Sequence, residues 1–510
     1  MMFSSGGNDG AGPSSSASAP EISGNNNKNK GIARAPKRTS LLSLNDLLTF
    51  RPLISPSKSN SQNGACSHDD DDNSRPPAVR RYASTSSGAC ISNHEDLLLQ
   101  ILLPLPPKSL IRFQCVSRQW FSLISSSHFC RLHSGMYRVF SLEVGLFLFR
   151  RIYGTSEFKA ISLLQDGSSH SIGILASRFA HFLNADGQVL GLHCCNGLMW
   201  VDFYWNYEVR RYYVYNPTTN QYRQIPIPEI DRYSRRIEAV NIVFDPLTYD
   251  QYKLVCVFAK LIAGEDAWGE FIFWQYSSET QAWKDCGGID IWDETNYGYY
   301  FEEGVFWDGN WHESNDSYYF EKGVFWDGNL YWVNSARSLL CFDFELECVR
   351  SLNVMNTYPA SPNGVVFYFG NCGGSLHLID LYKPRDDFLN VFELEMDMGL
   401  GRYHSRWLLK YRVDLGLLTA RYPLMSDEKF VNYREKEFPF GILCFQVDKK
   451  ANKAKLIISL PGKIISYEIS DMIFEELVEI EPAYVKFVRY NMSIYTWKDA
   501  FNHFEILSCV

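Results

Sequence analysis

The feature that most constrains this chain is a short, strongly apolar segment, residues 95–124. Sixteen of its thirty residues are Leu, Ile, Val, Phe, Trp or Cys, and only five are charged. A helical unit of about forty residues buries a small fraction of its own surface, so it cannot cover this many apolar side chains by itself. The surplus predicts a docking face.

Three helices are predicted in and around this segment, over residues 93–103, 108–114 and 117–125. Asn93 and Ser117 can cap the first and third helices, and the prolines between the first two helices end one and begin the next. Leucine and isoleucine go nearly all the way around the first helix, which predicts cover on more than one side. The cover is either a partner protein or, if the segment is an ordinary helical hairpin, the rest of this chain.

The order of residues in this segment resembles the F-box, especially its plant versions. The pieces that match, in order, are Asp96-Leu97-Leu98, Ile101-Leu102, Leu105-Pro106, Lys108-Ser109-Leu110, Arg112-Phe113, Cys115-Val116-Ser117 and Arg118-x-Trp120. The Leu-Pro pair that often opens the motif is replaced by Asn93-His94, which removes one apolar contact.

F-box modules bind the Skp-type adaptor of SCF ubiquitin ligases, so the resemblance implies this adaptor as a partner, and through it cullin and RING subunits. It also implies a non-catalytic receptor that binds a target protein for ubiquitination. Carried over by position, the adaptor-binding residues are Leu97, Leu98, Ile101, Leu102, Leu105, Pro106, Leu110 and Trp120.

From residue 137 onward, short runs of aliphatic and aromatic residues alternate with polar turn residues, which is typical of many short strands. Two bulky residues seven positions apart recur on either side of a polar turn and predict hairpins: Tyr215 and Tyr222, Tyr276 and Trp283, Phe342 and Val349, Tyr467 and Phe474. Phe244 and Tyr252 repeat the unit with one extra residue. Such repeats predict stacked β-modules, and a propeller of about six blades fits the length.

A second internal repeat matches more closely than the hairpin unit. Residues 299–310, YYFEEGVFWDGN, recur as residues 318–329 with one substitution. Asp-Gly in each copy predicts a tight hairpin turn. We expect residues 323–333 to form the better hairpin and the first copy to be an inserted loop or an extra ribbon.

Residues 185–350 resemble the F-box-associated and kelch-like regions of plant F-box proteins, in segments such as GLHCCNGLMWVDF and YYVYNPTTNQYRQIPIP. The resemblance implies that this region selects the target protein, but no ligand transfers with it. We therefore expect a multidomain chain. Residues 1–90 are a disordered Ser/Asn/Gly-rich arm, 91–134 an all-α F-box of three helices, and 135–510 an all-β repeat domain, a β-propeller, for target recognition.

Composition supports this division. Residues 1–90 contain eighteen serines and only three aromatic residues, too little to offset chain entropy. They carry ten basic and seven acidic residues, so +3 of the net charge of −9 lies there and −12 in residues 91–510. An acidic globular part is not the footprint of a general nucleic-acid binder.

Residues that could perform chemistry are sparse, and no catalytic site, metal site or cofactor is predicted. Gly373-Gly374-Ser375, with His377 and Asp380 nearby, and Cys194-Cys195 before Asn196-Gly197 are interpreted as turns rather than active sites. His312-Glu313 lacks the second histidine of a zinc protease. Paired carboxylates could also come from four acidic residues, but their spacing alone does not indicate a catalytic site: Asp293, Glu294, Glu302 and Glu303. Most of the aromatic residues near turns should be core, namely Trp200, Tyr204, Trp205, Trp292, Trp307, Trp311 and Trp326.

The cysteines and hydropathy indicate the compartment. The thirteen cysteines include no CxxC pair, and no apolar run is long enough to span a membrane. We expect the cytoplasm or the nucleus. Three other functions stay open: a glycan-binding, lectin-like F-box protein that uses exposed tryptophans, an interaction scaffold outside a ligase, and an enzyme built on the propeller.

Overall fold

The computed structural model describes residues 95–140, 145–152, 155–163, 179, 187–205, 209–229, 235–261, 268–290, 320–334, 336–352, 354–356, 359, 364–382, 386–397, 404–425, 438–449, 451–480, 483–486, 492–495, 497, 499–508 and 510. The predicted arm, the first duplicated copy and everything predicted between residues 291 and 319 lie outside these ranges. No helix in this described part is long and apolar enough to cross a membrane.

The predicted helices are confirmed as α3 (Glu95–Leu102), α4 (Pro107–Phe113) and α5 (Arg118–Ile124). The hydroxyl of Ser117 caps α5 and accepts a hydrogen bond from the backbone N–H of Trp120 at 3.1 Å. The cap predicted at Asn93 lies outside the described residues.

A fourth helix, α6 (Ser127–Phe140), extends the module beyond the three predicted helices. The Ser126 hydroxyl accepts a hydrogen bond from the Phe129 N–H at 3.2 Å and so caps its first turn. The apolar and polar residues of this segment alternate at helical spacing, but the run of serines before it concealed its start.

The rest of the described chain consists mainly of β-strands, with a short α-helix, α8 (Leu415–Arg421). Six sheets of three to five strands follow one another, and each forms one blade. The first five strand groups are β1 (Gly145–Ile152) and β2 (Thr155–Ser162); β3 (Gly187–Cys195), β4 (Leu198–Trp205), β5 (Val209–Asn216) and β6 (Gln221–Ile225); β7 (Arg235–Val243), β8 (Lys253–Leu261), β9 (Trp268–Ser277) and β10 (Ala282–Asp290); β11 (Val324–Trp326), β12 (Asn329–Val333), β13 (Leu339–Asp343) and β14 (Cys348–Leu352); β15 (Val354–Asn356), β16 (Val365–Cys372), β17 (Ser375–Leu381), β18 (Phe388–Asp397) and β19 (His404–Asp414).

The remaining elements complete the ring. They are helix α8 (Leu415–Arg421), strands β20 (Gly441–Asp448), β21 (Lys453–Leu460), β22 (Lys463–Glu468) and β23 (Ile473–Glu479), the small pair β24 (Ala483–Lys486) and β25 (Met492–Tyr495), and β26 (Asp499–His503). The predicted six-bladed β-propeller is therefore confirmed.

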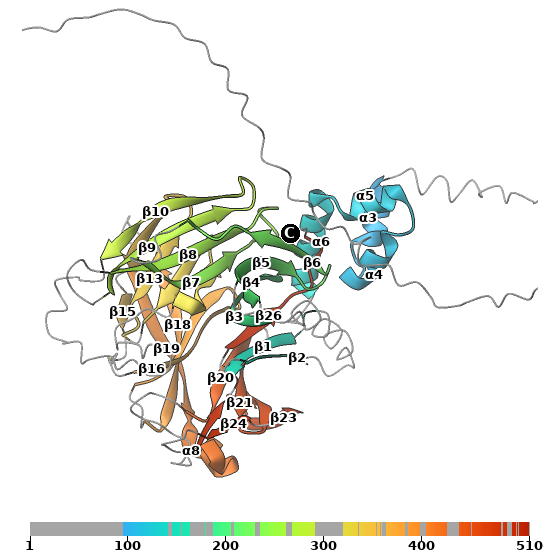
Figure 1. Cartoon of the computed structure of the whole chain (residues 1–510). Helices are drawn as coiled ribbons and strands as arrows, with labels where there is room; N and C mark the ends of the chain where they lie inside the picture. The colour runs from blue at the N-terminus through green and yellow to red at the C-terminus, as the bar shows by residue number, and fades with distance from the viewer. Residues whose placement is uncertain are drawn as a thin grey trace, which may run out of the picture. The chain divides into compact units, whose positions relative to one another are not determined.

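The ring is closed by strands from opposite ends of the β region. The strand order β2-β1-β26 places the last strand of the chain beside the first, and Phe147 lies opposite Phe501. Figure 1 shows this junction as a red strand beside a teal one. Inner strands of neighbouring blades also contact one another, namely β26 with β3, β3 with β7, β11 with β16, β16 with β20 and β20 with β26. Closure of the ring places the inner edge of every blade around the central cavity, where it is protected from pairing with other chains.

The recurring hairpin unit is confirmed in four blades, where its two bulky residues pair directly across the strands. In each turn the residue five positions after the first bulky one has a left-handed backbone with φ between 52° and 59°: Asn220, Gln281, Glu347 and Met472. Phe244 and Tyr252 likewise flank the connection of β7 to β8, just beyond the pair Val243 and Lys253. A left-handed residue lets a short loop reverse the chain within a twisted sheet.

The Gly323–Val333 hairpin is also confirmed. Trp326 pairs with Asn329, and Asp327 and Gly328 between them have φ of 44° and 77°. Both values lie in the left-handed region that a tight two-residue hairpin requires.

Candidate functional site

The helical module offers exposed apolar side chains. Leu97 and Ile101, four residues apart on α3, are 42% and 50% exposed, and Phe121 on α5 is 56% exposed. Val116, just before α5, is 59% exposed. We call these four residues the docking residues. Large apolar side chains at this exposure on so small a module fit a surface that another molecule covers.

The eight predicted adaptor-binding residues fall into two groups. Leu97, Ile101 and Pro106 are exposed, and Leu105 and Trp120 are half-buried. In contrast, Leu98, Leu102 and Leu110 are at most 2% exposed, because they form the module's own core. They can support the docking surface from below but have almost no surface of their own to present. Val116 and Phe121 were not among the predicted residues, although both lie inside the apolar segment.

The proline-rich turn between α3 and α4 is held in place by α6. His133 Nε2 lies 2.9 Å from the carbonyl oxygen of Leu105, and the His133 ring stacks on Phe129. Burial lowers the pKa of His133, which keeps the imidazole neutral. Helix α6 therefore positions the turn that presents Pro106.

The propeller encloses a second candidate site, a central cavity of about 760 Å³ lined by β3, β7, β11, β16, β20 and β26. This volume lies within the range of known ligand pockets. Four of these inner strands contain a β-bulge, and the extra residue lines the cavity each time: Leu190, Glu238, Phe367 and Leu443. A bulge bends its strand and redirects side chains, so the repeat shapes the cavity.

The charged residues that line the cavity are paired. The Arg210 guanidinium donates to both carboxylate oxygens of Asp202, through Nε at 2.9 and 3.0 Å. Lys322 Nζ lies 3.8 Å from Asp499 Oδ1, and Glu238 pairs with Arg236. Among the described residues no group of three histidines, cysteines or carboxylates could hold a metal ion. Each charge in these pairs is therefore compensated within the protein.

His193 in the cavity wall joins three blades. Its Nε2–H donates to the carbonyl oxygen of Gly323 at 2.8 Å, and its Nδ1 accepts a hydrogen bond from the Ile242 N–H at 3.2 Å. The second bond requires the neutral ring, because a protonated Nδ1 could no longer accept. Burial lowers the pKa of His193 to about 4.

Acid should therefore destabilise the propeller through His193. Its pKa is lower in the folded chain than the unfolded value near 6.5, so its contribution is complete above pH 6.5 and falls as the pH drops toward 4. At pH 5 the loss should be about 2 kcal/mol. Urea unfolding at pH 7 and pH 5 measures it. His193→Gln keeps a donor and an acceptor but cannot titrate, and its stability should decline less over this interval. Parallel declines in the two proteins would refute the assignment.

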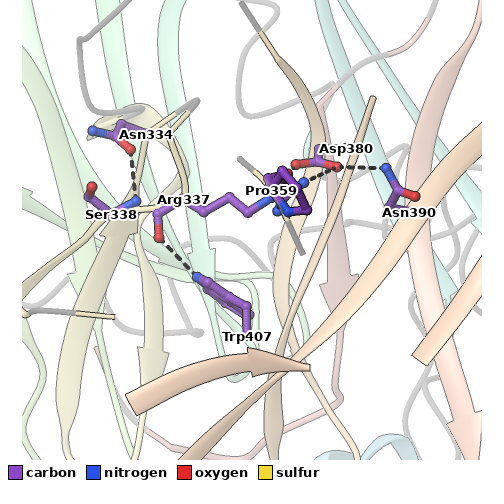
Figure 2. A network of polar contacts seen from close by, with 7 residues as sticks. All are labelled: Asn334, Arg337, Ser338, Pro359, Asp380, Asn390 and Trp407. Carbon is purple, nitrogen blue, oxygen red and sulfur yellow. Dashed lines mark hydrogen bonds and ion pairs between the residues drawn. The ribbon is translucent and has the colours of Figure 1, made fainter. Parts of the chain in front are cut away.

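A buried polar network joins the fourth and fifth blades (Figure 2). Arg337 and Asp380, with side chains 1% and 2% exposed, form an ion pair with an Nε to Oδ2 distance of 2.6 Å. Arg337 also donates to the carbonyl oxygen of Pro359 and its guanidinium stacks on Phe392, while its own carbonyl oxygen accepts from Trp407 Nε1. Because these groups satisfy one another inside the protein, the network stabilises the blade junction.

The motifs interpreted as turns are confirmed as turns. Gly373 and Gly374 are the left-handed residues of the β16–β17 hairpin, so they do not bring His377 and Asp380 together. Cys194 and Cys195 end β3, and the turn at Asn196-Gly197 follows. Of the aromatic residues, Trp200 is buried, Tyr204 is half-buried and Trp326 donates its Nε1–H to the carbonyl oxygen of Gly374.

Comparison with known proteins adds a family assignment for the helical module. The F-box domain family model matches residues 94–132. F-box protein At5g07610 of Arabidopsis thaliana is 24% identical over 409 residues, which are 78% of this chain and 88% of that protein. Similarity to an F-box protein therefore extends well beyond the helices.

Two further relatives from Arabidopsis thaliana match shorter stretches. Putative F-box protein At1g32420 is 32% identical over 203 residues, 38% of this chain and 59% of its own length. F-box only protein 8 is 61% identical over 36 residues, 7% of this chain and 12% of its own length. This chain spans less than two thirds of both proteins.

Proposed function

This chain is an F-box protein with a β-propeller region, and we propose that it is the substrate-recognition subunit of an SCF-type ubiquitin ligase. The docking residues bind the Skp-type adaptor, which connects the chain to cullin and RING subunits. The propeller binds the target protein. The chain itself is non-catalytic, and ubiquitination follows from holding the target near the enzymes of the complex.

The observation that carries this proposal is the exposure of large apolar side chains on the F-box module. Leu97, Ile101, Val116 and Phe121 are each at least 42% exposed. An adaptor that covers them would remove this apolar surface from water, which is the main driving force of protein association. Support for target binding comes from the cavity, whose mixed apolar and paired charged lining suits a protein segment better than a reaction centre.

We propose the cytoplasm or the nucleus as the working compartment. No disulfide joins any two of the ten described cysteines, including the neighbours Cys194 and Cys195. This supports a reducing environment, because disulfides form and persist in oxidising compartments and are rare in the cytosol and the nucleus.

The direct test is adaptor capture by the full chain. Leu97→Asp with Ile101→Asp places two charges on the proposed interface without disturbing the module's core, unlike changes at the buried Leu98 or Leu102. Loss of two anchor side chains of about 1 kcal/mol or more each should lower affinity roughly 30-fold. Binding is measured by co-purification and by titration calorimetry with a Skp-type adaptor.

The matched control is Leu346→Asp with Met472→Asp, at two propeller turns that are 63% and 60% exposed. It introduces the same two charges at similarly exposed positions and should leave capture unchanged. Equal adaptor affinity in the docking variant and the wild type, with both proteins folded, would refute the proposal.

A further inference from the structure

The segment after the last propeller strand enters the F-box core. Leu507, 4% exposed, packs in one cluster with Leu98, Leu102 and Phe129 of the helices. The Cys130 thiol lies 3.6 Å from the carbonyl oxygen of Leu507 and donates to it. A side chain more than 360 positions away in sequence therefore completes the core under the docking residues.

The same segment is fastened to the propeller on both sides of Leu507. The Asn216 amide donates to the carbonyl oxygens of Ile506 and Ser508, at 3.3 and 2.7 Å. The Thr218 hydroxyl accepts from the Ile506 N–H at 3.2 Å. Ile506 and Val510 are buried in the core shared by β3–β10. Leu507 is thus held between two residues anchored in the blades.

The fit of this segment on the propeller is close. A Cβ atom added to Gly197 would lie 2.6 Å from the carbonyl oxygen of Phe504 and 2.8 Å from the Ile506 side chain. Gly197 also has φ of 93°, so the β3–β4 turn needs glycine for two reasons. The turn and the segment are therefore packed against each other without spare room.

The position of Leu507 in the chain links it to ring closure. It follows His503, the end of β26, by four residues, and four residues span at most roughly 14 Å. If β26 leaves β1, the segment that carries Leu507 loses its fixed start and is held only by its contacts with the other blades, such as those to Asn216 and Thr218. The stability of the helices is then tied to a strand that is placed only when the ring closes.

We propose that the segment 504–510 acts as a folding checkpoint: the F-box module reaches full stability only when β26 has closed the propeller and seated Leu507. A chain with an open ring would then present a loosened docking surface to its adaptor. The consequence for adaptor capture rests on the proposed function, whereas the coupling itself does not.

Hydrogen exchange of the full chain tests the coupling without an adaptor. Leu507→Asp puts a carboxylate among leucines, so amides of α3–α6 should exchange at least tenfold faster, while those of β7–β23 keep their wild-type rates. Leu346→Asp, an exposed leucine in the β13–β14 turn, is the matched control and should change neither set. Unchanged α3–α6 exchange in Leu507→Asp, or equal acceleration in every blade, would overturn the proposal.

The second variant weakens closure and leaves Leu507 intact. Ala500→Pro with Phe501→Pro removes two adjacent N–H groups of β26, one of which must face β1. Exchange should accelerate in β1 and also at least tenfold in α3–α6. Full protection of the helices in this variant, with β1 exposed, would overturn the checkpoint. Failure of the wild-type chain to bind the adaptor, together with the predicted exchange pattern, would instead count only against the proposed function.

Discussion

A chain that ends before Asp499 should fail to fold cooperatively. It loses β26, the inner strand of the closing blade, and with it the buried side chains of Ile506, Leu507 and Val510. Full burial of each of these contributes about 1.5–3 kcal/mol, so together they approach the total stability of 5–15 kcal/mol typical of a protein. Urea titration followed by tryptophan fluorescence and circular dichroism should show a broad or absent transition.

The control is removal of residues 1–90, the arm that the sequence predicts to be disordered. This larger deletion should leave the transition midpoint unchanged, because the removed residues include only three aromatic side chains and are predicted to form no buried core. A cooperative transition near the wild-type midpoint in the chain without residues 499–510 would show that the propeller does not depend on this closure.

Replacing Arg337 by methionine should lower the free energy of unfolding by about 3–5 kcal/mol, because it leaves the carboxylate of Asp380 buried without its cation. The two side chains are 1% and 2% exposed, so water cannot replace the lost partner. Arg337 has φ of 64°, and methionine at that φ is strained to a similar degree as arginine. The change therefore isolates the ion pair and the packing of the guanidinium. Chemical denaturation at pH 7 measures it.

Two variants separate a buried charge from a surface one. Arg406→Met breaks the ion pair with Glu395, whose side chains are 51% and 47% exposed, and should change stability by less than about 1 kcal/mol. Arg337→Met with Asp380→Leu removes both buried charges and should recover much of the loss. If the double variant is as unstable as Arg337→Met alone, the penalty does not come from the uncompensated carboxylate.

Local structure could be predicted from the sequence. Tyr215 with Tyr222 and Tyr276 with Trp283 predicted hairpins whose strands pair at those residues, because a turn and its flanking side chains interact within a few positions. The helices over residues 95–124 were predicted for the same reason, since caps, prolines and apolar spacing act locally. The prediction of about six blades followed from the length of the β region.

The sequence did not predict which residues of the apolar segment 95–124 are buried and which are exposed. Leucines lie on nearly every side of α3, so the sequence does not show which face of the helix is buried. The packing of α4, α5, α6 and Leu507 against the helix buries Leu98 and Leu102. Leu97 and Ile101 remain exposed. Helix α6 itself was missed because the serines that precede it conceal where it begins.

The recurring hairpins, the helices α3–α5 and the F-box could be predicted from the sequence, because they depend on interactions between residues close together in the chain. The tertiary structure alone decided the closure of the ring by β26, the bridge of His193 across three blades, the pairing of Arg337 with Asp380 and the seat of Leu507 among the helices. Each of these joins residues that are far apart in the chain. Which distant groups meet is set by how blades and helices pack as whole units, and no short stretch of sequence contains that information.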